Sequence, residues 1–562
     1  MAQIIECVPN FSEGQNSAVI RQITDEIQKV EGVRLLNVDP GKATNRTVVT
    51  FVGSPEAVVE AAFLAIRRAG ELIDMSRHTG EHPRMGATDV CPLIPIAGIS
   101  MEETAAWAQR LAEKVGKELQ IPIYLYEAAQ SDKKRSNLSV IRAGEYEGFF
   151  KKIKQPEWAP DYGPAEFDVR RGGTVIGARD FLVAYNVNLN TTSTRRANSI
   201  AFDVREAGRV KREGDPITGK IVNDARGKPV YIPGSLKAVK AIGWYIEEYG
   251  MAQISMNLTN IHTTPVHIAF DEVCKKATER GIRVTGSELV GLIPLQAMLD
   301  AGKYFLQKQQ RSTGVSEKEL IRIAILSMGL DELGPFNPEE RIIEYLLRDK
   351  ADHKLVSLSL TDFADETASE SPAPGGGSIA AYVAALGAAL ATMVANLSSH
   401  KKGWDDRWEE FSQWAEKGQQ YKNELTRLVD ADTRAFNGIM TAFALPKATE
   451  EEKKHRTQAI QEATKIAIEI PFRVMEIAYN SLEVIRAMAE TGNPNSVSDA
   501  GVGALCARAG VMGAFMNVRI NAAGYADKTY AAAMIAKGKE IEDKTIEAET
   551  RILEVVNGKI GS

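Results

Sequence analysis

Cysteine is scarce in this chain and follows no recognisable pattern. The 562 residues contain four cysteines, which are widely separated and form no C-x-x-C pair. This distribution excludes a disulfide-stabilised fold and a zinc ribbon, and it is typical of a protein from a reducing compartment. Residues 1–14 also lack the basic start and the apolar run of a secretory signal. We therefore expect a cytoplasmic protein.

A strong net charge and a clear membrane-spanning run are lacking as well. The net charge is −6 and the isoelectric point is about 5.9, which gives no general attraction to nucleic acid or to an anionic membrane. One apolar stretch, 379–397, is rich in Ala and Gly and is more typical of a buried helix than of a membrane span. We expect neither nucleic acid nor a membrane as a partner.

Two patterns of hydrophobic residues divide the chain. Up to about residue 340, strands alternate with helices, and the order strand, helix, strand pair, Ser/Thr-Pro, helix occurs twice. Beyond about residue 347, long Ala-, Glu-, Lys- and Leu-rich segments follow. The predicted fold is therefore multidomain, with an N-terminal α/β part of two related α+β lobes with mixed sheets, followed by an all-α helical bundle. The predicted boundaries are 1–180 and 181–346 for the two lobes, 347–356 for a linker and 357–562 for the helical domain.

The stretch "RHTGEHPRMGATDVCP", residues 77–92, is the first candidate for chemistry. Its "HTGEH" segment matches H-x-x-E-H, an inverted zinc-protease motif that requires a helix. Gly80 and Pro83 disfavour a helix here, so we expect no metal site. Two alternatives remain. His82 is either a loop histidine that binds a backbone carbonyl, or an acid–base imidazole beside arginines that attract carboxylates.

A second candidate is an acid on the apolar side of a predicted helix. In "LVDADTRAF" (428–436), apolar residues lie three, four and seven positions from Asp432, whereas Asp430 falls on the polar side. Burial raises the pKa of such an acid and keeps it available as a proton donor; the alternative is a structural acid. The nearby "SPAPGGGS" (371–378) is either an anion site at a helix N-terminus or a plain capping turn with Ser378 as the cap.

Seven motifs, in the same order along nearly the whole chain, resemble those of the formimidoyltransferase-cyclodeaminase family. They are "ECVPNFSEG" (6–14), "RHTGEHPRMGATDVCP" (77–92), "IRAGEYEG" (141–148), "SELVGLIPLQAMLDA" (287–301), "ERIIEYL" (340–346), "APGGGS" (373–378) and "LVDADTRAF" (428–436). The resemblance implies a bifunctional enzyme of histidine catabolism and one-carbon metabolism. Its N-terminal part transfers a formimino group from N-formimino-L-glutamate to tetrahydrofolate. Its helical part cyclises the product to 5,10-methenyltetrahydrofolate and releases ammonia.

The resemblance also implies roles for particular residues. His82 corresponds to the acid–base residue of the transferase and Asp432 to the proton donor of the cyclodeaminase. The folate-binding loop corresponds to residues 163–172, with Gly234 as a further contact. The loop residues are Gly163, Pro164, Ala165, Glu166, Phe167, Asp168, Val169, Arg170, Arg171 and Gly172. The chemistry of transfer further suggests that Arg46 or Arg84 holds a glutamate carboxylate and that Asp39 orients the imidazole.

The implied cofactors and partners are few. Tetrahydrofolate, in polyglutamylated form, is expected as a co-substrate, with no metal, NAD or pyridoxal phosphate (PLP). A dimer-based homo-oligomer is expected from the family alone. One alternative is a formiminotransferase whose helical domain serves only as an oligomerisation scaffold; another is a folate carrier, which needs neither His82 nor Asp432. Segment 211–232 is longer than its equivalent in the animal enzymes, which leaves the edge of the folate cleft open to question.

Overall fold

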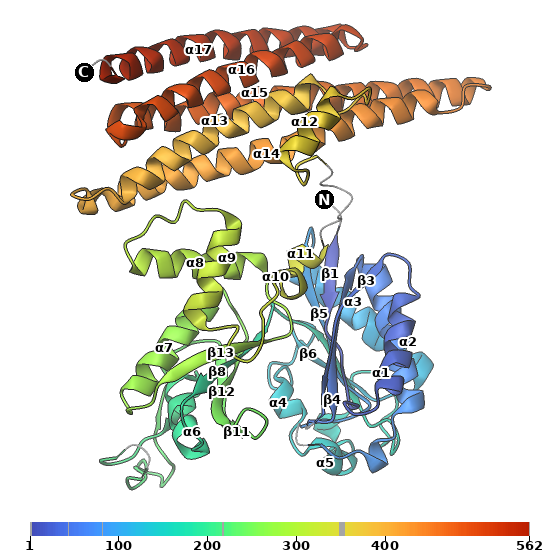
Figure 1. Ribbon diagram of the computed structural model, residues 1–562. Coiled ribbons are helices and arrows are strands. Elements are labelled where there is room, and N and C mark those ends of the chain that lie inside the picture. The colour runs from blue at the N-terminus through green and yellow to red at the C-terminus, as the bar shows by residue number, and fades with distance from the viewer. Residues whose placement is uncertain (1–2, 43, 81–82, 216–217, 348–354, 561–562) are drawn as a thin grey trace. The chain divides into compact units, whose positions relative to one another are not determined.

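The chain folds into two compact units, each described here by itself. The computed structural model describes residues 3–42, 44–80, 83–215, 218–347 and 355–560. The first unit comprises Met1–Ala297 and Met328–Leu346, and the second comprises Met298–Ser327 and Leu347–Ser562. Figure 1 shows the strands in the blue-to-green part of the chain and long helices in the yellow-to-red part. The predicted fold class, mixed α/β followed by a helical bundle, is confirmed.

The first lobe of unit 1 is built on one mixed sheet of seven strands. These are β1 (Ile4–Cys7), β2 (Asn10–Phe11), β3 (Val33–Gly41), β4 (Arg46–Gly53), β5 (Thr88–Ala97), β6 (Ile123–Glu127) and β7 (Thr174–Ala178). The short strands β1 and β2 lie between β4 and β5, with β3 beside β4 at one edge and β7 and then β6 beyond β5 at the other. The pairings β5–β7 and β6–β7 are parallel and the rest are antiparallel.

Three longer helices pack on this sheet and on one another: α1 (Ser17–Gln28), α2 (Pro55–Leu72) and α3 (Met101–Lys114). Helix α2 begins as the sequence predicts, because the Ser54 side chain accepts the Ala57 N–H and Pro55 occupies the first helical position. Shorter helical elements are η1 (Met75–Arg77), the π-helical turn η2 (Val115–Leu119), α4 (Leu138–Ile141), α5 (Glu145–Lys152) and η3 (Pro156–Trp158).

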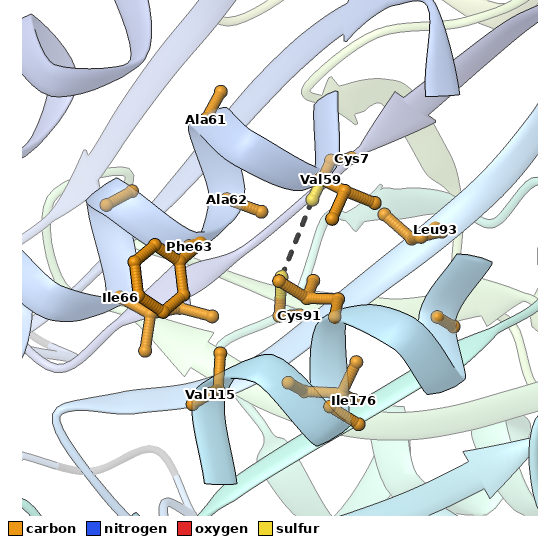
Figure 2. Close-up of a cluster of buried hydrophobic side chains, with 14 of the residues drawn as sticks. Cys7, Val59, Ala61, Ala62, Phe63, Ile66, Cys91, Leu93, Val115 and Ile176 are labelled. Atoms are coloured by element: carbon orange, nitrogen blue, oxygen red, sulfur yellow. Dashed lines mark hydrogen bonds between the residues drawn. The ribbon is translucent and has the colours of Figure 1, made fainter. Parts of the chain in front are cut away.

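A buried apolar cluster holds α2 against the sheet, and Figure 2 shows its centre. Phe63 and Ile66 of α2 lie beside Cys91 from β5, whose sulfur is 3.5 Å from that of Cys7 in β1. Burial of an apolar side chain of this size stabilises the fold by about 1.5–3 kcal/mol. Burial also raises the pKa of the Cys7 thiol well above its usual value. These cysteines therefore act as small apolar core residues.

The second lobe carries a four-stranded antiparallel sheet in the order β11-β12-β8-β13. Its strands are β8 (Val183–Leu189), β11 (Val239–Ile246), β12 (Met251–Leu258) and β13 (Val284–Val290), with a separate pair β9 (Arg209–Val210) and β10 (Tyr231–Ile232). Helices α6 (Thr194–Val204) and α7 (Val266–Thr278) pack on the four-stranded sheet. The order strand, helix, strand pair, helix thus occurs in both lobes.

Four helices follow the second lobe: α8 (Leu295–Lys308), α9 (Glu317–Met328), α10 (Pro338–Arg341) and α11 (Ile343–Leu347). Much of α8 and α9 belongs to the second unit, because the loop between them binds that unit's helices. Thr313 N–H donates to Ser412 Oγ at 3.0 Å, and Asn396 Nδ2 donates to the Gly314 carbonyl at 2.9 Å. The predicted linker, 347–356, falls largely outside the described residues.

The second unit is a bundle of long helices. They are α12 (Leu360–Ala368), α13 (Gly376–Ser399), α14 (Trp408–Ala444), α15 (Glu450–Thr491), α16 (Val497–Ala523) and α17 (Lys528–Ile560), with short turns η5 (Asp405–Arg407) and η6 (Pro494–Ser496). Small residues let α13 and α16 approach closely: a β-carbon built at Gly387 would lie 2.7 Å from the Gly503 carbonyl oxygen. Two helical stretches, Gly376–Ser399 and Pro494–Ala523, are long and apolar enough to cross a membrane. Both pack in the bundle with at least half of their apolar window buried, as in the core of a soluble protein.

Candidate functional site

The predicted transferase residue His82 and its neighbour Glu81 lie outside the described residues, so the first site is built from their surroundings. An open cavity of about 480 Å³ is lined by described residues that precede and follow this gap in the chain. Its lining residues are Thr79, Gly80, Arg84, Gly144, Glu145 and Glu147. Three of them come from the stretch 77–92 and three from "IRAGEYEG" (141–148). The described parts of the two motifs therefore meet in space at this cavity.

Arg84 organises one wall of this cavity. Its Nη2 donates to Glu147 Oε1 at 2.6 Å, and its Nη1 lies 3.3 Å from Glu145 Oε2. Its Nε donates to His78 Nδ1 at 3.2 Å, while His78 Nε2 lies 2.9 Å from the Asn45 carbonyl oxygen. A carbonyl only accepts and the guanidinium only donates, so Nε2 of His78 donates to Asn45 and its Nδ1 accepts from Arg84. The hydrogen bond from Arg84 lowers the pKa of Glu147 below its ordinary value.

Asp89, further along the same stretch, is fully buried and binds two arginines. Its Oδ2 accepts from Arg46 Nη1 at 2.5 Å and from Arg142 Nη2 at 2.7 Å, and its Oδ1 accepts the Met85 N–H at 2.9 Å. Arg46 also donates from Nε and Nη2 to Asn10 Oδ1. Burial lowers the pKa of Arg46, and the Asp89 carboxylate opposes that shift. This network fixes the backbone that leads into β5, and it occupies the guanidinium of Arg46.

We expect Asp89→Asn to destabilise the first lobe by about 3–5 kcal/mol, because it leaves two buried guanidinium groups without their counter-charge. Hydrogen exchange resolved by mass spectrometry measures this locally, at the amides of β5, and does not require the whole chain to unfold in one step. Glu113→Gln is the control: its carboxylate pairs with Lys117 in a largely exposed ion pair, and its loss should cost at most about 1 kcal/mol. Equal protection of β5 in both variants would contradict the structural role of Asp89.

The predicted folate loop, 163–172, is hydrogen-bonded to described residues on either side of the stretch that contains His82. The Met75 N–H donates to the Arg170 carbonyl and the Ala87 N–H to the Arg171 carbonyl, both at 2.8 Å. Gly172 has a φ of +67°, and a β-carbon there would lie 2.7 Å from the Gly86 Cα, so this crossing needs glycine. Sequence positions 84 and 95 residues apart are thus held together by main-chain hydrogen bonds.

Side chains within the loop are largely used to hold its shape. Asp168 Oδ1 accepts the N–H groups of Arg170 and Arg171, both at 2.9 Å, and its Oδ2 accepts from Arg171 Nε. Phe167 packs against Tyr146 and Phe149, with ring centroids 5.4 and 5.8 Å apart. The side chains of Glu166, Val169 and Arg170 are exposed. A ligand of this loop would therefore meet backbone groups and exposed side chains.

Two further predicted residues lie elsewhere in unit 1. Asp39 is in β3, where burial raises the pKa of its carboxyl, with Arg341 opposing the shift and Glu288 adding to it. Gly234 lies in the second lobe, tight against the end of α6, where a β-carbon would collide with the Arg205 carbonyl.

The second site is at the start of α13, where Asp432 from α14 meets the first turn of that helix. Asp432 Oδ2 accepts from Ser378 Oγ at 3.1 Å, and the carboxyl also accepts the Ser378 N–H. Gly375 caps α13 with no side-chain hydrogen bond, which leaves the first N–H groups of the helix directed at this point. Burial raises the pKa of Asp432 above its ordinary value, and the two bonds from Ser378 only partly oppose that shift. The acid therefore holds its proton more tightly than a solvated aspartate.

Two predictions about this region are wrong in detail. Ser378 does not cap α13: the N-cap is Gly375, and Ser378 is buried inside the first turn, where its hydroxyl binds the Val429 carbonyl and Asp432. Asp430 is buried, not on the polar face, because its Oδ1 accepts the Leu355 N–H at 2.9 Å. The spacing argument considers one face of α14, whereas a helix in a bundle is covered on several sides.

Gly377 is required for the close approach of Asp432, which gives a sharp test. A β-carbon at Gly377 would lie 2.6 Å from Cγ of Asp432, so Gly377→Ala must displace the carboxyl. We expect the reaction that depends on Asp432 to fall by about 100-fold. Gly376→Ala is the matched control, since a β-carbon there meets only Asn517 Nδ2, at 3.6 Å. Rates of the helical-domain reaction in the two variants measure the difference, and equal rates would contradict the geometry.

Among the described residues there is no group of three or more His, Cys, Asp or Glu side chains that could hold a metal ion. The "HTGEH" segment itself has two of its residues outside that part of the chain. The carboxylates of Glu145 and Glu147 at the cavity are not anticipated by the analysis of residue types, although they lie within a motif that carries the family resemblance. Glu145 and Glu147 lie four and six residues after Ile141 and follow no hydrophobic periodicity, so the sequence pattern alone does not mark them as site residues.

Comparison with known proteins covers nearly the whole chain. Residues 4–179 match the family described as formiminotransferase domain, N-terminal subdomain; residues 184–348 match the formiminotransferase domain; residues 359–540 match formiminotransferase-cyclodeaminase. The formimidoyltransferase-cyclodeaminase of Mus musculus is 44% identical over 531 residues, which are 94% of each chain. A glutamate formimidoyltransferase of Streptococcus pyogenes is 40% identical over 307 residues, 55% of this chain and 94% of that protein. A methenyltetrahydrofolate cyclohydrolase of Methylorubrum extorquens is 38% identical over 205 residues, 36% of this chain and 97% of that protein.

Proposed function

Because the chain belongs to the formimidoyltransferase-cyclodeaminase family, we propose that it carries both activities for which that family is named. The observation that carries this proposal is identity of 44% along 94% of both chains, across the two parts of the molecule. The chain transfers the formimino group of N-formimino-L-glutamate to tetrahydrofolate and then cyclises 5-formiminotetrahydrofolate to 5,10-methenyltetrahydrofolate. Glutamate and ammonia are the other products.

We assign the transfer step to the two α/β lobes, 1–180 and 181–346. N5 of tetrahydrofolate attacks the amidine carbon of formiminoglutamate and loses its proton, while the glutamate nitrogen gains a proton and leaves. An imidazole that accepts the first proton and returns it to the leaving nitrogen fits this chemistry, and we propose His82 for it. The cavity lined by Thr79, Gly80 and Arg84, and the hydrogen bonds from Met75 and Ala87 to loop 163–172, support this assignment.

We propose Arg84, in preference to Arg46, as the group that holds a substrate carboxylate. Arg84 lines the cavity, and its acidic partners Glu145 and Glu147 are half-exposed there. A substrate carboxylate can take the place of Glu147 on the guanidinium without leaving a buried charge. Arg46 is bound instead to the buried Asp89 and to Asn10. Asp39 remains the proposed orienting residue for the imidazole.

We assign cyclisation to the helical domain, 357–562, joined by the linker 347–356. N10 of 5-formiminotetrahydrofolate attacks the formimino carbon and loses its proton. The former imino nitrogen carries one hydrogen and gains two more, of which the second arrives as a proton when the C–N bond breaks and ammonia leaves. Asp432 is the proposed donor of that proton, since its raised pKa and its place beside the open N-terminus of α13 suit a neutral carboxylic acid. Tetrahydrofolate serves as co-substrate in both steps.

The name of one relative favours a second candidate activity for the helical domain. The Methylorubrum extorquens protein that matches 205 residues of this chain is named as a methenyltetrahydrofolate cyclohydrolase. In that reaction water attacks the methenyl carbon, so the same acid acts on a hydroxyl intermediate in place of an amine. The two activities are distinguished by supplying the full chain with 5-formiminotetrahydrofolate or with 5,10-methenyltetrahydrofolate. Ammonia release and methenyl absorbance from the first substrate support the cyclodeaminase, whereas consumption of the second alone supports the hydrolase.

We further propose that the protein is a dimer-based homo-oligomer of the cytoplasm. Exposed apolar side chains on α13 and α16 support self-association; they include Leu386, Leu397, Val502, Leu505, Met516 and Ile520. The two nearest thiols, of Cys7 and Cys91, are 3.5 Å apart without a disulfide, as expected in a reducing compartment. Sedimentation at increasing concentration measures the assembly, and a monomer at all concentrations would contradict it.

A further inference from the structure

A cavity in the second lobe is lined by arginines that the proposed reactions do not use. It has a volume of about 470 Å³ and lies between α6 and the segment that follows it. Its lining residues include Arg195, Arg205, Arg209 and Arg212, together with the rings of Phe202 and Tyr231. No acidic residue among the described parts of the chain lines it. We call this cavity the arginine pocket.

Three of the four guanidinium groups lack an acidic partner among the described residues. Arg209 pairs with Asp203 at 3.0 Å. Arg205 instead donates from Nε to the Gly208 carbonyl at 2.9 Å, and Arg212 donates from Nη1 to the Gly219 carbonyl at 2.7 Å. Arg195 makes no hydrogen bond or ion pair within the described part of the chain. Carbonyl oxygens satisfy donors but do not neutralise charge, so a surplus of positive charge remains in one cavity.

The local backbone adds to this positive potential. Arg195 and Arg196 occupy the first turn of α6, which has no acidic residue there. The helix dipole is positive at this end, so cations are unfavourable and an anion is favourable. Burial lowers the pKa of Arg205, because part of its charge is removed from water, and Tyr231 opposes that shift. An unoccupied cluster of like charges is costly, and a bound anion removes that cost.

The pocket takes two of its lining residues from segment 211–232, which the family resemblance predicts to be longer here than in the animal enzymes. Arg212 and Tyr231 belong to segment 211–232, and Tyr231 lies in β10, which pairs with β9. Phe202 carries the guanidinium of Arg205 over its ring at 4.0 Å, which orients that group. An aromatic floor and converging guanidinium groups are suited to a small, multiply charged ligand, and the volume matches a ligand of small-molecule size.

We propose that the arginine pocket binds a small molecule carrying two or more phosphate or carboxylate groups. Three cations without acidic partners exceed what a singly charged anion neutralises, whereas a di- or trivalent anion matches them. The proposal does not rest on the proposed function, because none of the residues that line the pocket is assigned to either reaction.

The test measures binding of two probes, inorganic pyrophosphate and tri-γ-glutamate, to the full chain by calorimetry at 50 mM and 200 mM salt. We expect at least one probe to bind with a micromolar Kd that weakens at the higher salt. The double variant Arg195→Gln/Arg212→Gln should weaken that binding at least about tenfold. Pyrophosphate alone identifies a phosphate ligand, tri-γ-glutamate alone identifies a carboxylate ligand, and binding of both indicates a general polyanion site; each supports the proposal.

A matched control separates this site from overall charge. Arg226→Gln/Lys228→Gln removes the same two charges from exposed positions of the same segment, outside the pocket, and should change the affinity by less than about twofold. The single variant Arg195→Gln, at an exposed residue, tests the pocket without risk to folding and should weaken binding at least about threefold. Absence of binding by both probes, or equal loss in the two double variants, would overturn the proposal.

Discussion

Asp432→Asn is expected to abolish ammonia release while formimino transfer continues at the wild-type rate. Asparagine keeps the shape of the side chain and can still accept a hydrogen bond from Ser378, but it has no acidic proton to give to the leaving amine. General acid catalysis accounts for about 100- to 10,000-fold in rate, and a loss in that range is expected here. The measurement supplies 5-formiminotetrahydrofolate directly and follows ammonia, so that the first reaction does not limit the second.

The pH dependence of the same reaction gives a second readout. Only the protonated form of Asp432 donates, so the rate contribution of this acid is full below its pKa in the folded protein and declines as pH rises through that pKa. Burial raises the pKa of Asp432, so the decline is expected at a higher pH than for a solvated aspartate. This limb of the profile should disappear in Asp432→Asn.

Asp430→Asn is the matched control for that experiment. Asp430 lies two residues away in α14 and is buried, but its Oδ1 is bound to the Leu355 N–H. We expect Asp430→Asn to reduce stability while ammonia release stays within about tenfold of the wild type. A larger loss of ammonia release in Asp430→Asn than in Asp432→Asn would transfer the proposed role to the other acid.

His82→Ala is expected to abolish glutamate release from formiminoglutamate and to leave cyclisation intact. Removal of the imidazole leaves neither an acceptor for the N5 proton nor a donor to the leaving nitrogen, so transfer should fall by about 100- to 10,000-fold. The two reactions are assayed separately on one preparation, with glutamate measured for the first and ammonia from 5-formiminotetrahydrofolate for the second. Loss of both activities would contradict separate sites.

His78→Ala controls for the loss of any imidazole from the same stretch. The ring of His78 lies between Arg84 Nε and the Asn45 carbonyl, so its hydrogen bonds are already used. We expect a loss of less than about tenfold in transfer, through a looser Arg84. A larger effect in His78→Ala than in His82→Ala would assign the acid–base role to His78.

Elements whose signals are local could be predicted from the sequence. Ser54 and Pro55 mark the start of α2 because capping involves neighbouring residues only, and the hairpin of β11 and β12 follows from two short apolar runs. The short strands β1 and β2 each pair with both β4 and β5. This arrangement could not be predicted, because it depends on pairings between residues far apart in sequence. The same holds for the loop between α8 and α9, whose polar groups bind helices about 100 residues away.

The same distinction, between local sequence signals and contacts of distant residues, holds for the candidate site. The burial of Asp432 is predictable from helical spacing, and its raised pKa agrees with that prediction. The contact with Ser378 and the need for Gly377 come from the crossing of α13 and α14, which no single helix specifies. The ion pairs of Arg46 and Arg142 with Asp89 join three segments that are far apart in sequence. Residue types alone therefore suggest that Arg46 can bind a substrate, whereas in the fold its guanidinium is bound to Asp89.

The most direct test of the central claim, that one chain moves a formimino group to tetrahydrofolate and then expels its nitrogen, follows that nitrogen. Formiminoglutamate labelled with 15N at the imino position is incubated with tetrahydrofolate and the full chain. We predict one labelled ammonia for each 5,10-methenyltetrahydrofolate formed and an equal amount of unlabelled glutamate. Glutamate and 5-formiminotetrahydrofolate without labelled ammonia would contradict the claim, as would labelled ammonia without a methenyl product.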